Sequence, residues 1–399
     1  MHVLADTQAL VAHGVISPHQ AREIEQRGRA KMVSLAANAI LIAGIMAATG
    51  GLIFWLADAR AVALLGLAAL GMGTLVGRRF PSMISGAATL IGAGLLIGGG
   101  ALELVTSHDA IAGPVLATVG AGIAAAAAWR AKPPSFVTRA IGLMGLAAHL
   151  LGAGHIIDAA ALSGLPLSAF WLYATALLVA AGWWLDVRLV TALAIVPFAQ
   201  ALETGTFYWH ATYAFYSPES TLSILQMSAA IALCLALVKG RTPRHARHAD
   251  IFALMAFVVA NLCALVGSLW GDVVGEHIWG VGRYRDGDFD SYDTWSAAHA
   301  AFRDTALTLS PGLYAVVWAI ALAAIASWAA WTARRGLFNA TVTFAAIHGY
   351  TQLFESFGTQ PWAYAVGGLT AIPLAWSLWR ANDRIAARRN TATPPAAAP

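Results

Sequence analysis

Long apolar runs alternate with short polar segments along almost the whole chain. Each run approaches or exceeds the length of a membrane-crossing helix, which needs about 20 mostly apolar residues. The runs lie at residues 33–57, 61–77, 83–105, 111–129, 137–157, 165–185, 189–207, 221–238, 250–270, 311–331, 337–357 and 361–379. The pattern predicts an all-α, polytopic integral membrane protein with about 12 transmembrane helices.

The segment before the first run, residues 1–31, has its own helical pattern. Ser17, Pro18 and Gln20 are spaced as an N-cap, a first helical residue and a capping-box partner. We expect this segment to form a small cytoplasmic helical hairpin. An amphipathic segment that lies on the membrane fits the same residues.

The remaining chain is predicted to form a transmembrane helical bundle at residues 32–380 and a flexible Pro/Ala-rich tail at 381–399. The longest outer loop covers residues 271–309. Within this loop, Trp295 and Phe302 belong to the apolar edge of a short helix expected at the outer surface.

Lysine and arginine positions predict the orientation, because cytoplasmic loops carry the excess of these residues. With the N-terminus inside, 20 of the 24 Lys and Arg residues fall on the inner side. The four on the outer side are Arg60, Arg283, Arg285 and Arg303. Both termini are therefore expected in the cytoplasm. The protein itself is expected in a bacterial inner (plasma) membrane.

Composition agrees with a membrane location. Charged residues make up 11% of the chain and hydrophobic residues 59%, whereas a soluble domain has about 25% charged residues. The net charge of +4 is spread over short loops rather than one face, so no nucleic-acid partner is expected. The basic loop at residues 239–250 fits either anionic lipid headgroups of the bilayer or an orientation signal alone.

Six polar residues inside apolar runs are candidates for function. Ionisable groups inside a span are costly and usually face a bundle interior or a wet cavity. Helical spacing puts members of the seventh and eleventh runs on common faces. The resulting candidate polar pathway consists of Glu103, Gln200, Glu203, His348, Gln352 and Glu355. The alternative for Glu203 is that its side chain extends to the nearby headgroups.

The three glutamates of this pathway lie on runs three, seven and eleven, which are all predicted to run outward. The stretches QALETGTFYWHATYA and QLFESFGTQPWAYA also share Gln-x-x-Glu, Gly-Thr and a Trp. This similarity suggests three four-helix units in parallel orientation, an internal repeat of the kind found in some transporters.

Several residues predict contacts between helices. The GxxxG pairs Gly73–Gly77 and Gly94–Gly98 allow close helix approach, and Asn261 can hydrogen-bond to a neighbouring helix. His149 and His155 are six residues apart and therefore lie on different faces of one run. We expect them to be packed and hydrogen-bonded rather than metal ligands.

The sequence has no recognised enzyme motif: Walker, GxSxG and HExxH patterns are absent. Asp286, Asp288 and Asp290 match the first three ligand positions of a calcium loop. Ser291 and Ala297, however, stand where that loop needs glycine and glutamate. No metal or cofactor is therefore expected, and whether the chain is an enzyme stays open.

Three stretches resemble a known family. They are LVAHGVISPHQAREIEQRG directly before an apolar span, the glycine-rich IGAGLLIGGGALEL, and the late-span GYTQLFES. All three are similar to uncharacterised bacterial multi-span inner-membrane proteins of the domain-of-unknown-function 2157 type. The chain departs from them in lacking Gln-x-Tyr after Glu103 and in its long acidic outer loop. That family has no established activity, so the resemblance implies location and architecture only.

Three functions fit these observations. The first is a transporter or permease for a small solute, with the polar pathway open to the outside. The second is a non-catalytic membrane scaffold or sensor whose N-terminal hairpin binds a cytoplasmic partner. The third is a membrane enzyme that uses the outer carboxylates on a lipid-linked substrate. Transport predicts water around the glutamates, whereas a scaffold predicts dry packing.

Overall fold

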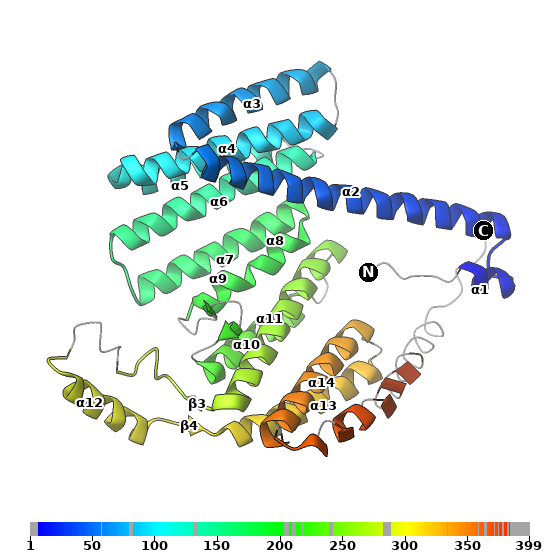
Figure 1. Cartoon of the computed structure of the whole chain (residues 1–399), viewed down its shortest axis with the longest axis vertical. Helices are drawn as coiled ribbons and strands as arrows, with labels where there is room; N and C mark the ends of the chain where they lie inside the picture. Colours follow the sequence, from blue (N-terminus) through cyan, green and yellow to red (C-terminus); the bar gives the residue numbers. More distant parts are fainter. Residues whose placement is uncertain are drawn as a thin grey trace. The chain divides into compact units, whose positions relative to one another are not determined.

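The described part of the chain is all-α apart from two short two-stranded antiparallel sheets (Figure 1). The computed structural model describes residues 7–56, 58–79, 83–130, 135–202, 207–209, 213–216, 219–238, 242–281, 289–332, 334–357, 359–362, 365–370, 372–373, 375–376, 379–380 and 383. The chain forms two compact units, Met1–Ala161 and Leu162–Pro399.

The first unit is built around one central helix, α4. Its helices are α1 (Thr7–Ala12), α2 (Pro18–Leu56), α3 (Ala59–Arg79), α4 (Met83–Ser107), α5 (Asp109–Arg130) and α6 (Phe136–Ala159). Helix α4 contacts α2, α3, α5 and α6, and the closest pairs are α3 with α4 and α5 with α6 (Figure 1). Neighbours in sequence therefore pack as antiparallel hairpins, as short connections require.

Glycine brings α3 and α4 into backbone contact. A Cβ atom at Gly92 would lie 2.3 Å from the amide nitrogen of Leu70, and one at Gly66 would lie 2.3 Å from that of Leu96. A real Cβ atom does not fit at such distances, so only glycine permits this separation of the two helices. Small residues serve this role in membranes because helix association there depends on close packing.

The two predicted GxxxG pairs face different neighbours. A Cβ atom at Gly73 would lie 2.7 Å from the backbone of Thr89 on α4. Gly94 and Gly98 instead face side chains of α2, at 3.0 and 3.1 Å. The predicted close approaches are confirmed. Gly73 lies at the contact between α3 and α4, and Gly94 and Gly98 lie at the contact between α4 and α2.

The N-terminal segment forms a turn between α1 and α2, which contact each other. The predicted capping box is confirmed: the Ser17 amide donates to Gln20 Oε1 at 2.9 Å, and the Gln20 amide donates to Ser17 Oγ at 3.2 Å. Helix α2 begins at Pro18 and continues for 39 residues. The second helix of the predicted hairpin is therefore continuous with the first apolar run.

The second unit surrounds α11. Its elements are α7 (Leu165–Leu185), α8 (Arg188–Leu193), α9 (Ile195–Gln200), β1 (Phe207–Trp209), β2 (Tyr213–Tyr216), α10 (Ser220–Val238), α11 (Pro243–Trp270), β3 (Asp272–Val273), α12 (Tyr292–Thr305), β4 (Thr308–Leu309), α13 (Pro311–Trp331) and α14 (Arg335–Phe357). Helix α11 contacts α7, α8, α9, α10, α13 and α14 (Figure 1). Strands β1 and β2 pair antiparallel, as do β3 and β4.

Eight helices of the described residues are long and apolar enough to cross a membrane. They are α3, α4, α5, α6, α7, α10, α11 and α13, and each coincides with a predicted run. These helices indicate a membrane-embedded protein. The run predicted at residues 361–379 lies partly outside the described residues. Asp286, Asp288 and most of the predicted tail at 381–399 also lie outside them.

The seventh apolar run does not form a single helix in the structure. The described part of the run at residues 189–207 contains two short helices, α8 and α9, with a break at Ala194 in place of one continuous helix. Pro197 has no N–H to bond the carbonyl of Leu193, so the ladder is interrupted there. The stretch from Arg188 to Gln200 extends only about 20 Å.

The loop at residues 271–309, predicted to lie on the outer side, contains the predicted short helix, α12. It begins with a capping box between Ser291 and Thr294. Two of its residues, His299 and Arg303, bind Glu276 at 2.7 and 3.0 Å. Helix α12 is thereby attached to the segment that follows α11.

The boundary between the units does not follow the predicted repeat. It falls near Ala161, after the fifth apolar run. Three four-helix units would divide the chain after the fourth and eighth runs.

Candidate functional site

The first residue of the predicted polar pathway is engaged in an ion pair. Glu103 Oε1 accepts a hydrogen bond from Arg60 Nε at 2.6 Å, and the Glu103 side chain is 20% exposed. Arg60 lies in the first turn of α3 and Glu103 in the last part of α4. The pair therefore joins the two ends of the α3–α4 hairpin within the first unit.

The other members of the pathway belong to the second unit. Gln200 ends α9, and Glu203 lies outside the described residues. On α14, His348 is buried, Gln352 is partly buried and Glu355 is exposed. The predicted stripe of α14 therefore faces the protein at His348 and the surface at Glu355.

His348 packs against an aromatic residue of α13. Its ring centroid lies 4.5 Å from that of Trp318. In the described part of the chain, His348 Nδ1 and Gln352 Nε2 are buried without a hydrogen-bond partner. Buried polar atoms are nearly always paired, so an unpaired couple on one helix face is a feature of functional interest.

Trp318 connects His348 to α11. The Trp318 indole Nε1 donates to Asn261 Oδ1 at 2.9 Å, and Asn261 Nδ2 donates to the carbonyl of Phe257 at 2.7 Å. The predicted interhelical hydrogen bond of Asn261 is thus confirmed, with Trp318 as its partner.

A cavity of about 340 Å³ lies between α10, α11 and α13, within the second unit, and is open on the side where Leu225, Leu313 and Val317 are exposed. Its wall is almost entirely apolar. The polar residues of the wall are Thr221 and Ser228 on α10, Asn261 on α11 and Tyr314 on α13, together with the indole of Trp318. Three helices therefore contribute polar groups to one apolar space.

One end of the cavity is held together by the carboxylate of Asp272. Its Oδ2 atom accepts hydrogen bonds from the Thr221 amide at 2.7 Å, from the Thr221 hydroxyl and from the Tyr314 hydroxyl at 3.2 Å. The Thr221 amide belongs to the first turn of α10, where the helix dipole also favours a negative charge. We call Asp272, Thr221 and Tyr314 the Asp272 group.

A second carboxylate at the start of α10 is completely buried. Glu219 has no exposed surface and accepts from the amides of Gly275 at 2.8 Å and His277 at 2.6 Å. It thereby holds the turn after β3 against α10. The sequence interpretation missed Glu219 and Asp272 because it searched inside the apolar runs, and these residues lie just outside two of them.

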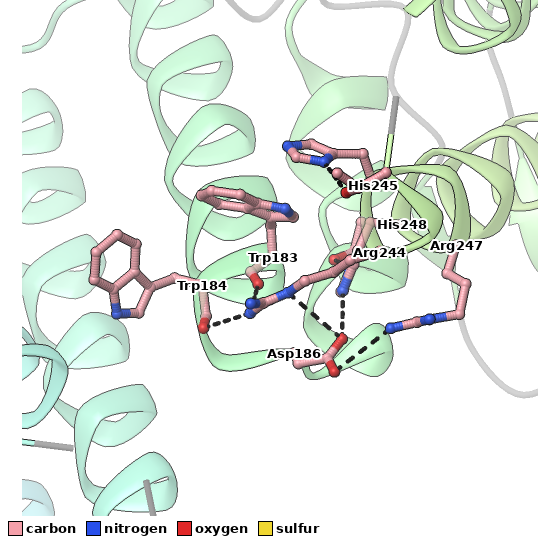
Figure 2. Close-up of polar contacts among 9 residues, drawn as sticks. Trp183, Trp184, Asp186, Arg244, His245, Arg247 and His248 are labelled. Atoms are coloured by element: carbon pink, nitrogen blue, oxygen red, sulfur yellow. Dashed lines mark hydrogen bonds and ion pairs between the residues drawn. The ribbon is translucent and has the colours of Figure 1, made fainter. Parts of the chain in front are cut away.

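A third polar network joins α7, α8 and α11 (Figure 2). Asp186 lies in the turn between α7 and α8, with a positive φ of 53°. The ring of His248 stands between Asp186 Oδ1, 3.1 Å from Nε2, and Thr191 Oγ1, 2.7 Å from Nδ1. This Asp–His–Thr order is that of a catalytic triad, but Thr191 is only 1% exposed and its hydroxyl cannot reach a substrate. The network therefore fastens the α7–α8 turn to α11.

Two arginines of the predicted basic loop complete this network (Figure 2). Arg244 Nη2 donates to the carbonyls of Trp183 and Trp184 at the end of α7, and its guanidinium lies 5.4 Å from the Trp183 ring centroid. Arg247 lies 3.7 Å from Asp186 Oδ2. Cations at a helix C-terminus are favoured by its dipole, so these contacts stabilise the turn.

The same contacts change the acidity of Asp186. The hydrogen bond from His248 lowers the pKa of the Asp186 carboxyl; partial burial opposes this effect, and the charges of Arg244 and Arg247 add to it. A depressed pKa in the folded state stabilises the protein above the unfolded-state pKa of about 3.9, and this stabilisation is lost as the pH falls through the folded-state value.

We therefore predict that Asp186→Asn lowers the stability of the purified protein in detergent at neutral pH. We expect a loss of about 1 kcal/mol, since 44% of the side chain is exposed to screening solvent. The midpoint of thermal unfolding should fall less on acidification below about pH 4 in this variant than in the wild type. The control is Asp250→Asn, an exposed aspartate on α11. Identical pH profiles for the two variants would contradict the role of Asp186.

No protein-family model matches the sequence, and no curated protein or solved structure is detectably similar to it. Among the described residues, no group of three His, Cys, Asp or Glu side chains is arranged to hold a metal ion. The cavity and the polar networks of the second unit are the features that bear on function.

Proposed function

We propose that the chain is a multi-pass protein of the bacterial inner membrane that carries a small solute, as a transporter or permease. The observation that supports this is the cavity between α10, α11 and α13. Its volume of about 340 Å³ falls in the range of small-molecule sites, about 300–1,000 Å³. A mainly apolar wall with a few polar groups from different helices is also typical of such sites.

The proposed topology has about 12 spans and both termini in the cytoplasm. The Lys and Arg distribution supports the orientation. In this arrangement the seventh crossing contains α8 and α9. A helix interrupted within a crossing is a recurring feature of secondary transporters, where the break lies near the substrate site. The break at Ala194, a fully buried residue, is an interruption of this kind, and α8 and α9 do not line the cavity.

The predicted polar pathway keeps its place in this proposal. His348 on α14 packs on the cavity-wall residue Trp318. A solute that moves Trp318 would therefore also move His348. The resemblance to inner-membrane proteins of the 2157 type belongs to the same proposal and bears only on location and architecture. Anionic lipids at the Arg244 and Arg247 loop are a proposed partner beside the solute.

A membrane scaffold or sensor is the second candidate, and one observation favours it. Helix α2 extends for 39 residues from the capping box at Ser17 into the first apolar run. At 1.5 Å per residue it is about 58 Å long. A continuous helix of this length could transmit a displacement between the N-terminal turn and the membrane.

Water access to the cavity separates the two candidates. In a background with Cys234 and Cys263 changed to serine, single cysteines are placed at Ser228, His348 and the outer-loop residue Ser291. Intact cells are then treated with a membrane-impermeant thiol reagent. Transport predicts labelling of Ser228→Cys and His348→Cys as well as Ser291→Cys, because a carrier must open its site to water.

The matched control is Ala229→Cys, an exposed residue of α10 that does not line the cavity. It should stay unlabelled because it faces lipid in the proposed topology. Labelling restricted to Ser291→Cys would end the carrier proposal and leave the scaffold, whose test then moves to the N-terminal turn.

A further inference from the structure

We infer that the cavity binds the alkyl chain of an amphiphile, with a neutral or cationic, hydrogen-bond-donating head placed at the Asp272 group. This inference rests on the proposed function in taking the cavity as the solute site. It adds the chemical class of the solute, which the polar pathway alone does not indicate.

The shape of the cavity suits an extended chain. On α13 its wall continues from Leu313 to Ile325, a rise of about 18 Å along the helix. On α10 it continues from Thr221 to Ile231, about 15 Å. A space of about 340 Å³ that follows two helices over such lengths must be narrow, so it accommodates one chain better than a compact solute.

The chemistry of the wall selects hydrocarbon over a polar solute. Between the two ends it is formed mainly by apolar side chains, among them Ile224, Leu225, Val317 and Leu322, and Ser228 supplies one hydroxyl. A polar group placed there would lose its water without gaining a partner, at a cost of about 2–7 kcal/mol. Asn261 does not change this, since its carbonyl already accepts from Trp318 and its amide donates to Phe257.

The Asp272 group determines the preferred head. Its two hydroxyl protons, from Thr221 and Tyr314, are used within the group: each hydroxyl donates to the carboxylate or to the other hydroxyl. What both oxygens still offer to the cavity is lone pairs, so the head must donate hydrogen bonds. The Asp272 carboxylate behind them repels an anionic head and attracts a cationic one. An alkylamine or alkyl alcohol therefore fits, and a fatty-acid anion does not.

The test uses three photoreactive probes with the same long alkyl tail: an amine, an alcohol and a carboxylate. Each is cross-linked to the purified full-length protein in detergent, and the labelled residues are mapped by mass spectrometry. We expect the amine and the alcohol to label cavity residues of α10 and α13, and the carboxylate to label them at least ten-fold less. Equal labelling by all three, or no labelling in the cavity, would overturn the inference.

Two variants on one helix show whether the label reports the cavity. Ala321 lines the cavity on α13, and Ala321→Phe should reduce labelling by the amine at least ten-fold. Ala323 is also exposed on α13 but does not line the cavity, so Ala323→Phe should leave labelling unchanged. If Ala321→Phe does not elute as a folded protein on gel filtration, Ser228→Leu fills the cavity from α10. Undiminished labelling in the folded cavity-filling variant would refute the assignment.

Tyr314→Phe tests the head separately from the tail. It removes one acceptor oxygen, so the amine and the alcohol should bind about two- to ten-fold more weakly. The discrimination against the carboxylate should persist, because Asp272 is still present. Unchanged amine and alcohol affinities in this variant would place the head elsewhere and refute this part of the inference.

The outcome is distinguishable from that of the carrier proposal. Amphiphile binding without water access at Ser228→Cys would leave this inference standing and end the carrier proposal. Water access without amphiphile binding would do the reverse, and a polar solute would then be sought.

Discussion

Gly92→Ala is expected to lower the stability of the first unit by about 1–3 kcal/mol, although alanine is the better helix former by about 1 kcal/mol. The new Cβ atom would lie 2.3 Å from the Leu70 amide nitrogen, and ordinary van der Waals contact begins at 3.4 Å. Backbone atoms cannot rotate aside as a side chain can. Helices α3 and α4 would therefore have to separate along their whole contact.

The matched control lies eight residues further along α4. A Cβ atom added at Gly100 would meet no neighbouring atom within 4 Å, so Gly100→Ala gains helix propensity without a clash. Its midpoint of thermal unfolding in detergent should equal or exceed that of the wild type, whereas Gly92→Ala should unfold earlier. Hydrogen exchange should also increase in α3 and α4 of Gly92→Ala before it increases in the second unit. The same midpoint for both variants would show that the α3–α4 contact does not depend on glycine.

Much of the fold follows from local pattern, and this contact shows why. The apolar runs mark where helices begin and end, because a lipid-facing backbone must bond within its own segment. Glycine spacing then indicates which faces approach closely. The pattern does not show the partner: Gly73 meets α4 and Gly94 meets α2, a difference that only the packed structure reveals.

The seventh run shows where the pattern fails. Residues 189–207 form an apolar run, so hydropathy alone predicts one more helix. The break depends on a single missing donor at Pro197 and on the packing of Ala194 inside the second unit. Pro197 indicates an interrupted ladder, but a proline within a membrane helix is often tolerated when neighbours satisfy the freed carbonyl, so it does not fix where the helix ends.

The candidate site was less predictable than the fold. The sequence interpretation selected ionisable residues inside apolar runs, and His348 proved to pack on a cavity-wall residue. It passed over Asp272 and Tyr314, because an acid after a span and a tyrosine near the start of one are ordinary interfacial residues. Their association depends on the return of the chain from α12 through β4, which brings α13 against α11.

Glu219→Ala is expected to lower the stability of the second unit by about 3 kcal/mol or more. The carboxylate has no exposed surface, and it is the acceptor for the amides of Gly275 and His277. Each buried donor left without a partner costs about 1–3 kcal/mol. The missing side chain adds the cost of a cavity. The midpoint of thermal unfolding of the purified protein in detergent measures the sum of these effects.

Glu23→Ala is the control for Glu219→Ala, because Glu23 forms an exposed ion pair with Arg27 one helical turn away. Such pairs contribute about 0.3–0.5 kcal/mol, so this midpoint should hardly move. Glu219→Gln should fall between the two, since its amide oxygen can accept from one of the two backbone amides but its NH2 group opposes the other. If Glu219→Ala were as stable as Glu23→Ala, the turn after β3 would not depend on this carboxylate. The end of the cavity at Thr221, two residues further along the chain, would then have to be held by Asp272 alone.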